Sequence, residues 1–197
     1  MKKILLYILA SVILQEGFAQ KWAKEYDHVD DCVCGLSLVG KGDKHGFVNK
    51  DGVLIVPLIY DEALTFSEGM AAVKADGKWG FIDSTGKVII PLKYADAMSF
   101  NDGLGVVSDG NGYGYVDNTG KVVIPLQYEN ARRFSEGLAP VMNNKMRWGY
   151  IDRNNKIVIP YHYLMGDLFE NGVARVMESG GVMLYIDKSG KKVQVSE

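Results

Sequence analysis

The sequence predicts an all-β fold of tandem ~34-residue repeats, and three observations lead to this prediction. Four of the five prolines recur at spacings of 34, 34 and 35 residues, at Pro57, Pro91, Pro125 and Pro160. Two glycine columns keep the same period: Gly35, Gly69, Gly103, Gly137 and Gly172, and then Gly46, Gly80, Gly114 and Gly149. Aromatic residues follow the prolines in register: Tyr60, Tyr94, Tyr128 and Tyr163, then Phe66, Phe100, Phe134 and Phe169.

Each unit is predicted to be a three-stranded antiparallel meander of short strands followed by a packed connector. In residues 69–102 the strands are expected at 70–74, 79–83 and 88–90. Asp76-Gly77 and Thr85-Gly86 suit hairpin turns because glycine takes positive φ without a steric penalty. Pro91 is expected to end the third strand because it cannot donate to a ladder. The connector that follows has room for a helical turn.

The repeat divides the chain into five units behind an atypical leading segment. The predicted units are residues 35–68, 69–102, 103–136, 137–171 and 172–197. Residues 20–34 form a partial repeat, since Tyr26-Asp27 lies 34 residues before Tyr60-Asp61. Terminal units of repeat arrays are usually atypical because they act as caps. We therefore expect one repeat domain with a cap at its N-terminal end.

The strand pattern predicts that the units stack on one another. In the predicted second strand, Phe81 and Ile82 point to opposite faces, so both faces carry large apolar groups and both must be covered. Two arrangements satisfy this requirement, an open solenoid-like array and a closed five-bladed propeller-like ring. Propeller blades usually have four strands. Because each unit here shows three, with no spare terminal strand to close a ring, the open array is favoured.

The N-terminus and the composition predict an exported, soluble protein. Lys2 and Lys3 precede an apolar run over residues 4–14, and Gly17-Phe18-Ala19 matches a signal-peptidase site, so residues 1–19 are predicted to be a cleaved signal peptide. No second apolar stretch reaches the length of a membrane span. A net charge of −2 and a pI near 5.9 argue against a nucleic-acid binder. The expected location is periplasmic or extracellular.

Several columns together resemble a known repeat. The motif consists of Lys78-Trp79-Gly80-Phe81-Ile82-Asp83 and Gly86-Lys87-Val88-Ile89-Ile90-Pro91, followed by Tyr94-Ala95-Asp96-Ala97 and Phe100. Parts of the same motif return as Phe134-Ser135-Glu136-Gly137-Leu138 and as Arg147-Trp148-Gly149-Tyr150-Ile151-Asp152. This pattern resembles the WG-repeat (KWG) family of bacterial proteins over residues 35–197. The resemblance implies a β-rich repeat module that is often exported and has no general enzymatic activity. The chain departs from the family's tryptophan at His45, Tyr113 and Met183.

The candidate binding residues occupy that same column, one in each unit. They are His45, Trp79, Tyr113 and Trp148, followed by Met183 in the last unit. Evenly spaced aromatic side chains can stack on sugar rings or anchor a partner protein. The competing interpretation is structural: each side chain packs between units or over the neighbouring glycine.

No metal or cofactor is predicted. The aspartates Asp83, Asp117, Asp152 and Asp187 each bring only one carboxylate to a turn, so they are interpreted as caps of their own turn backbone and not as calcium ligands. Cys32 and Cys34 have one residue between them, which matches no standard zinc spacing. Cys32 is expected to fill the core position held by Phe66 in the next unit. A strained disulfide or a bridge to another chain are the other possibilities for this pair.

These observations leave two function hypotheses, neither of them enzymatic. No motif supplies a nucleophile, an acid–base pair or a phosphate loop, and residues that recur once per unit are usually scaffold. The favoured hypothesis is an exported, non-catalytic protein-interaction or scaffold module with an unknown protein partner. Residues that differ between units, such as Arg132-Arg133, would then give specificity. The alternative is a carbohydrate-binding module that uses the aromatic column on a polysaccharide.

Overall fold

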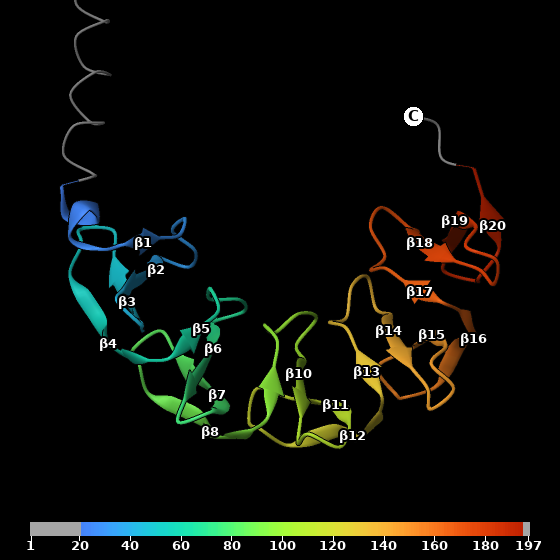
Figure 1. The fold of residues 1–197 in the computed structure, drawn as a ribbon, viewed down its shortest axis with the longest axis horizontal. Coiled ribbons are helices and arrows are strands. Elements are labelled where there is room, and N and C mark those ends of the chain that lie inside the picture. The colour runs from blue at the N-terminus through green and yellow to red at the C-terminus, as the bar shows by residue number, and fades with distance from the viewer. Residues whose placement is uncertain (1–20, 195–197) are drawn as a thin grey trace, which may run out of the picture.

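The computed structural model describes residues 21–194, so the predicted signal peptide lies outside the described residues. Five four-stranded antiparallel sheets follow one another along an open arc (Figure 1). We call these sheets blades 1 to 5. The prediction of an all-β open array is therefore confirmed, and the alternative of a closed five-bladed ring is not what the structure shows.

The strands of each blade follow the chain in order. Blade 1 has β1 (His28–Val29), β2 (Leu36–Lys41), β3 (Lys44–Asn49) and β4 (Leu54–Tyr60), behind the short 3-10 helix η1 (Trp22–Glu25). Blade 2 has β5 (Glu62–Ala63), β6 (Met70–Ala75), β7 (Lys78–Asp83) and β8 (Val88–Tyr94). Blade 3 has β9 (Asp96–Ala97), β10 (Gly105–Ser108), β11 (Tyr113–Val116) and β12 (Val122–Tyr128). Blade 4 has β13 (Asn130–Ala131), β14 (Ala139–Met142), β15 (Trp148–Ile151) and β16 (Ile157–Tyr163). Blade 5 has β17 (Met165–Gly166), β18 (Val173–Met177), β19 (Met183–Asp187) and β20 (Lys192–Val193).

Each blade contains the three predicted strands, which keep the names first, second and third strand, and a fourth, two-residue strand that precedes them in the chain and comes from the predicted connector. In blade 2, Glu62 and Ala63 pair with Lys74 and Val73 of β6, where the sequence pattern offered a helical turn at most. These two-residue strands lie on the inner side of the arc, and β4, β8, β12 and β16 lie on its outer side (Figure 1). Each sheet therefore begins inside the connector of the preceding predicted unit, and neighbouring blades are joined without a linker.

The third strand of blades 1 to 4 runs through its proline, so the prediction that proline ends this strand is wrong. In blade 2, β8 extends from Val88 to Tyr94 with Pro91 inside it. The reason is that β8 is the last strand of its sheet, where a missing N–H faces solvent and removes no ladder bond. Beside this proline, the pairing of β7 with β8 shifts in register between Trp79 and Phe81 and again between Phe81 and Ile82.

The register shift explains the glycine column at positions 46, 80, 114 and 149. A Cβ atom on Gly80 would lie 2.5 Å from the carbonyl oxygen of Ile90, and one on Gly114 would lie 2.5 Å from that of Ile124. The third strand thus crosses directly over this glycine. Glycine is needed here because two backbones approach closely, and a side chain would push them apart.

The other glycine column closes a tight turn just before the first predicted strand of each blade, and we call this turn the entry turn. Glu68 and Gly69 both have positive φ, at 51° and 80°, and Ser67 and Met70 pair across them. Two successive residues with positive φ are typical of a type I′ hairpin turn. The same geometry recurs at Asp102-Gly103 and Glu136-Gly137.

The hydrophobic core lies between the blades. One face of each second strand carries an aromatic ring that packs edge-on against the phenylalanine of the next connector. The ring pairs are Phe47–Phe66, Phe81–Phe100, Tyr115–Phe134 and Tyr150–Phe169, with centroids 4.7, 4.9, 4.9 and 5.1 Å apart. The opposite face packs on the preceding blade, as Ile82 does against the cluster around Phe47. A blade excised alone would therefore expose both of its apolar faces.

No blade precedes blade 1 among the described residues, and Trp22 takes that place. Between blades 1 and 2, Gly86 lies against Val56, and Gly120 lies against Ile90 at the next junction. The equivalent glycine of blade 1, Gly52, lies directly beneath the indole of Trp22. The helix η1 is therefore the cap of the array.

Candidate functional site

The structure places the predicted aromatic column inside the blade junctions. Trp79 and Trp148 are only 6% and 5% exposed, and His45 and Tyr113 are half-buried. Each pairs across the sheet with a tyrosine of the third strand, as Trp79 does with Tyr94. The two indole rings therefore present no open face to a sugar.

The polar atoms near this column are engaged within the blade. The Tyr113 hydroxyl donates to Asp96 Oδ2 at 2.9 Å, and His45 Nδ1 lies 3.0 Å from the carbonyl oxygen of Asp61. Burial, followed by the hydrogen bond to Asp96, raises the pKa of Tyr113. The column thus fixes the inner part of each blade junction.

The entry turns are tied to one another by carboxylates. Glu68 Oε2 accepts the backbone N–H of Gly103 at 2.8 Å, and Asp102 Oδ2 accepts that of Gly137 at 3.0 Å. Glu136 accepts from Gly172 and pairs with Lys188 Nζ at 2.9 Å. The hydrogen bond from Lys188, together with that from Gly172, holds the pKa of Glu136 below its usual value. The repeat spacing did not predict these contacts between successive turns. Their only sign in the sequence is an acidic residue at each of positions 68, 102 and 136.

The aspartate column caps its own turns, as predicted. Asp83 Oδ1 accepts the backbone N–H groups of Thr85 at 2.9 Å and of Lys87 at 3.1 Å. The hydroxyl of Thr85 donates to the same oxygen and is the main cause of the lowered pKa of Asp83. Asp117, Asp152 and Asp187 accept the equivalent backbone bonds.

The prediction that Cys32 fills a core position is wrong. Cys32 and Cys34 are both exposed and both are free thiols. Phe66 is buried because it packs on Phe47 of the preceding blade, whereas no blade within residues 21–194 precedes Cys32. Among residues 21–194, no group of three or more His, Cys, Asp or Glu side chains is arranged to hold a metal ion.

A charged cluster at the junction of blades 4 and 5 has no counterpart in the repeat pattern. Asp167 Oδ1 lies 3.1 Å from Arg132 Nη1, and Asp167 Oδ2 lies 3.0 Å from Arg175 Nε. The Arg132 guanidinium also lies 5.3 Å from the ring centroid of Trp148. The Tyr150 hydroxyl donates to the carbonyl oxygen of Asp167 at 2.8 Å. The two arginines are therefore held in place by fixed partners.

This cluster lines a pocket of about 360 Å³. The lining residues are Arg132, Asp167, Leu168, Glu170, Arg175 and Tyr185. Arg132 was singled out from the sequence as a unit-specific residue, but Asp167 and Arg175 were not. The aligned repeats did contain a sign of Arg175, because it stands at the position where earlier blades have Leu38, Ala72, Val106 and Pro140.

Four successive stretches match the family described as WG containing repeat: residues 46–79, 79–113, 113–146 and 148–181. The chain belongs to the WG-repeat family. The name-giving glycine of this family is the one that the third strand crosses in the structure. Comparison of the WG-repeat chain with curated proteins finds no match.

Solved structures show a similar fold at low sequence identity. Kluyveromyces lactis Hsv2 is 11% identical with a TM-score of 0.55, over 81% of this chain and 59% of that one. A eukaryotic initiation factor is 7% identical with a TM-score of 0.56, over 85% of this chain and 54% of that one. The WG-repeat chain thus spans little more than half of either structure. The WD40 β-propeller domain of Doa1 aligns at 12% identity with a TM-score of 0.48, over 86% of this chain and 69% of that one. Within the described part of the chain, no helix is long and apolar enough to cross a membrane.

Proposed function

We propose that this WG-repeat protein is an exported, non-catalytic module that binds a partner protein at the junction of blades 4 and 5. The observation that carries the proposal is the pocket built around Arg132, Asp167 and Arg175. The repeat itself does not require this cluster, since the other junctions are formed without it. A charged cluster found at one junction and not at the others can give this array specificity for its own partner.

The chemistry of the pocket suits a protein partner. Arginine and tyrosine are the residues most often found at the energetic centre of interfaces. Here Asp167 pairs with both arginines, which restricts their side chains before a partner binds. Asp167 accepts one N–H from each guanidinium, and the N–H groups that remain favour a partner that carries a carboxylate. Tyr185, which is 39% exposed, offers a ring in the same pocket.

Two substitutions test this site against a matched control. Arg132→Gln with Arg175→Gln removes both guanidinium groups and keeps polar side chains. The control is Lys74→Gln, because Lys74 likewise pairs with an acid, Glu62, and lies 5.8 Å from the centroid of a buried tryptophan ring. Each tagged protein is used to capture proteins from native envelope extract, with and without soluble polysaccharide.

We expect wild type and Lys74→Gln to retain the same proteins, and the double variant to retain about tenfold less of them, the equivalent of about 1.4 kcal/mol. Equal retention by all three proteins would contradict the proposed site. Release by a polysaccharide would contradict the protein partner and favour the carbohydrate alternative. Export is tested separately by sequencing the mature N-terminus, which should begin at Gln20. A mature chain that still begins at Met1 would contradict export.

A further inference from the structure

Three methionines form one row across the last blade. Met165 of β17 is opposite Met177 of β18, and Met177 is opposite Met183 of β19. In blade 2 the same row consists of Glu62, Lys74 and Trp79. In blade 3 it consists of Asp96, Ser108 and Tyr113, and in blade 4 of Asn130, Met142 and Trp148. Only in blade 5, among the described residues, are all three positions methionine.

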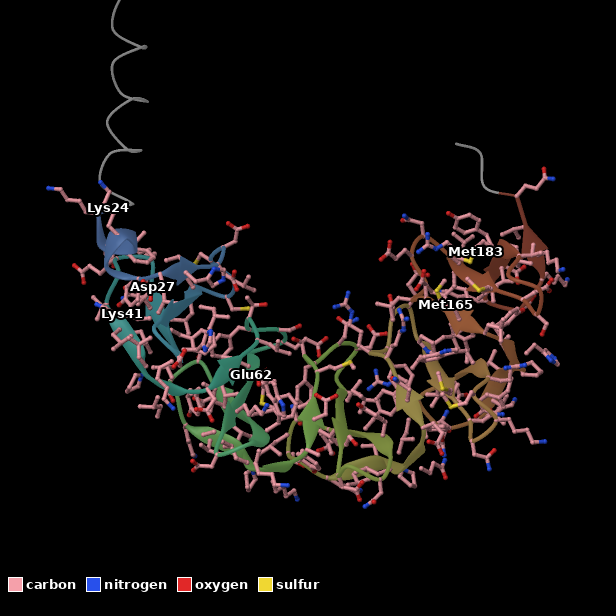
Figure 2. The ribbon with its side chains drawn as sticks, viewed as in Figure 1. Lys24, Asp27, Lys41, Glu62, Met165 and Met183 are labelled. Atoms are coloured by element: carbon pink, nitrogen blue, oxygen red, sulfur yellow. The ribbon has the colours of Figure 1, made fainter. Side chains whose placement is uncertain are left out.

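The register places the three methionine side chains in one row on the same face of the sheet. Side chains of directly opposed residues project from the same face of a sheet, with Cβ atoms about 5 Å apart. Met177 lies between the other two, and methionine has three rotatable bonds with which to direct its sulfur toward them. Figure 2 shows Met165 and Met183 in blade 5. The row is therefore compact enough for its sulfur atoms to share one ligand.

The row is also accessible to solvent. In blade 4 the equivalent Trp148 is covered by the next connector, where a Cβ atom on Gly166 would lie 3.4 Å from Trp148 Cβ. No described residue covers blade 5 in that way, and Met183 is 41% exposed. Met165 and Met177 are half-buried. An ion could thus reach the sulfur atoms without any opening of the fold.

We propose that Met165, Met177 and Met183 form a binding site for a soft monovalent cation, Cu(I) or its redox-inert analogue Ag(I). Thioether sulfur is a soft ligand that selects Cu(I), whereas Zn²⁺, Ca²⁺ and Mg²⁺ prefer nitrogen, thiolate or oxygen ligands. Thioethers carry no titratable proton near neutral pH, so binding at this site does not compete with protons.

The test must first remove the competing thiols. Cys32 and Cys34 are exposed and would bind Cu(I) themselves, so all proteins carry Cys32→Ser and Cys34→Ser. Cu(I) is supplied under ascorbate and titrated against a chromophoric Cu(I) chelator, and Ag(I) is titrated in parallel while the melting temperature is followed. The variants are Met177→Leu and the triple change of Met165, Met177 and Met183 to leucine. Leucine is close to methionine in volume and apolar, so the fold should persist.

Met146→Leu is the matched control because Met146 is 59% exposed and lies outside the row. We expect one equivalent of Cu(I) per chain in the parent and in Met146→Leu, and an affinity about 100-fold lower in Met177→Leu, which corresponds to about 2.7 kcal/mol. The triple variant should bind no Cu(I), and its melting temperature should not rise with Ag(I). No binding by the parent, or equal binding by the parent and the triple variant, would overturn the site.

Discussion

The close approach of two backbones at the repeat glycine makes a sharp prediction for Gly114→Ala in the central blade. The new Cβ atom would lie 2.5 Å from the carbonyl oxygen of Ile124 and 2.7 Å from that of Pro125. Both neighbours are backbone, so neither can rotate away. An ordinary Cβ contact begins near 3.4 Å, and the third strand must therefore retreat by about 0.9 Å.

The size of the effect follows from two opposing contributions. Overpacking costs about 1–3 kcal/mol, and weakening the ladder bonds beside the register shift costs about 1 kcal/mol more. Alanine regains about 0.5–1 kcal/mol because it loses less backbone entropy than glycine on folding. These contributions together predict that Gly114→Ala lowers the free energy of unfolding by about 1–3.5 kcal/mol. Urea unfolding followed by tryptophan fluorescence and far-UV circular dichroism measures this difference.

Gly40→Ala is the matched control, since Gly40 also lies within a strand. A Cβ atom there would meet its nearest neighbour, the His45 ring, at 3.4 Å, which is ordinary contact. By the same entropy argument, the control should leave the free energy of unfolding unchanged or raise it by up to about 1 kcal/mol. If the two variants have the same stability, the explanation of the glycine column by backbone approach is refuted.

Three further predictions follow from the junctions and the cap. Trp79 and Trp148 should be strongly protected from acrylamide quenching in a Trp22→Phe variant, and quenching near that of free tryptophan would contradict their burial. Glu136→Gln should be less stable than wild type at neutral pH. Because the pKa of Glu136 is lowered in the folded state, its contribution to stability is present above the unfolded pKa, about 4.3, and is lost as the pH falls through the folded pKa. A stability difference that persists at pH 2 in urea titrations would contradict this. Trp22→Ala should accelerate hydrogen exchange in β2 to β4 by the equivalent of about 2 kcal/mol and leave blade 4 unchanged, whereas uniform acceleration would argue against a local cap.

The repeat architecture could be predicted from the sequence because the residues that recur with the period are ones that few other residue types can replace. Glycine at a positive φ angle, as at Gly69, and large apolar groups on both faces of a strand, as at Phe81 and Ile82, indicate turns and stacking directly. The fourth strand could not be predicted, because a two-residue strand such as Glu62–Ala63 has no periodicity of its own. Its position depends on pairing with β6, which only the folded chain shows.

Proline and cysteine misled the prediction for related reasons. Pro91 stops a strand in the interior of a sheet but not at its edge, and the sequence does not say which strand is the last one. Cys32 occupies a phenylalanine column, yet that column is buried only where a preceding blade supplies the other ring. The charged cluster at Arg132 was visible in part, since its residues differ from those of the other units, but the contact with Asp167 needed the structure.

Small-angle X-ray scattering in solution distinguishes an open arc of blades from a closed ring. A compact domain of this length has a radius of gyration of about 16 Å. The structure predicts a clearly larger value, and a distance distribution extended by the separation between blades 1 and 5 (Figure 1). A radius of gyration near that of a compact domain would show that the blades close on one another in solution, and it would contradict the open array.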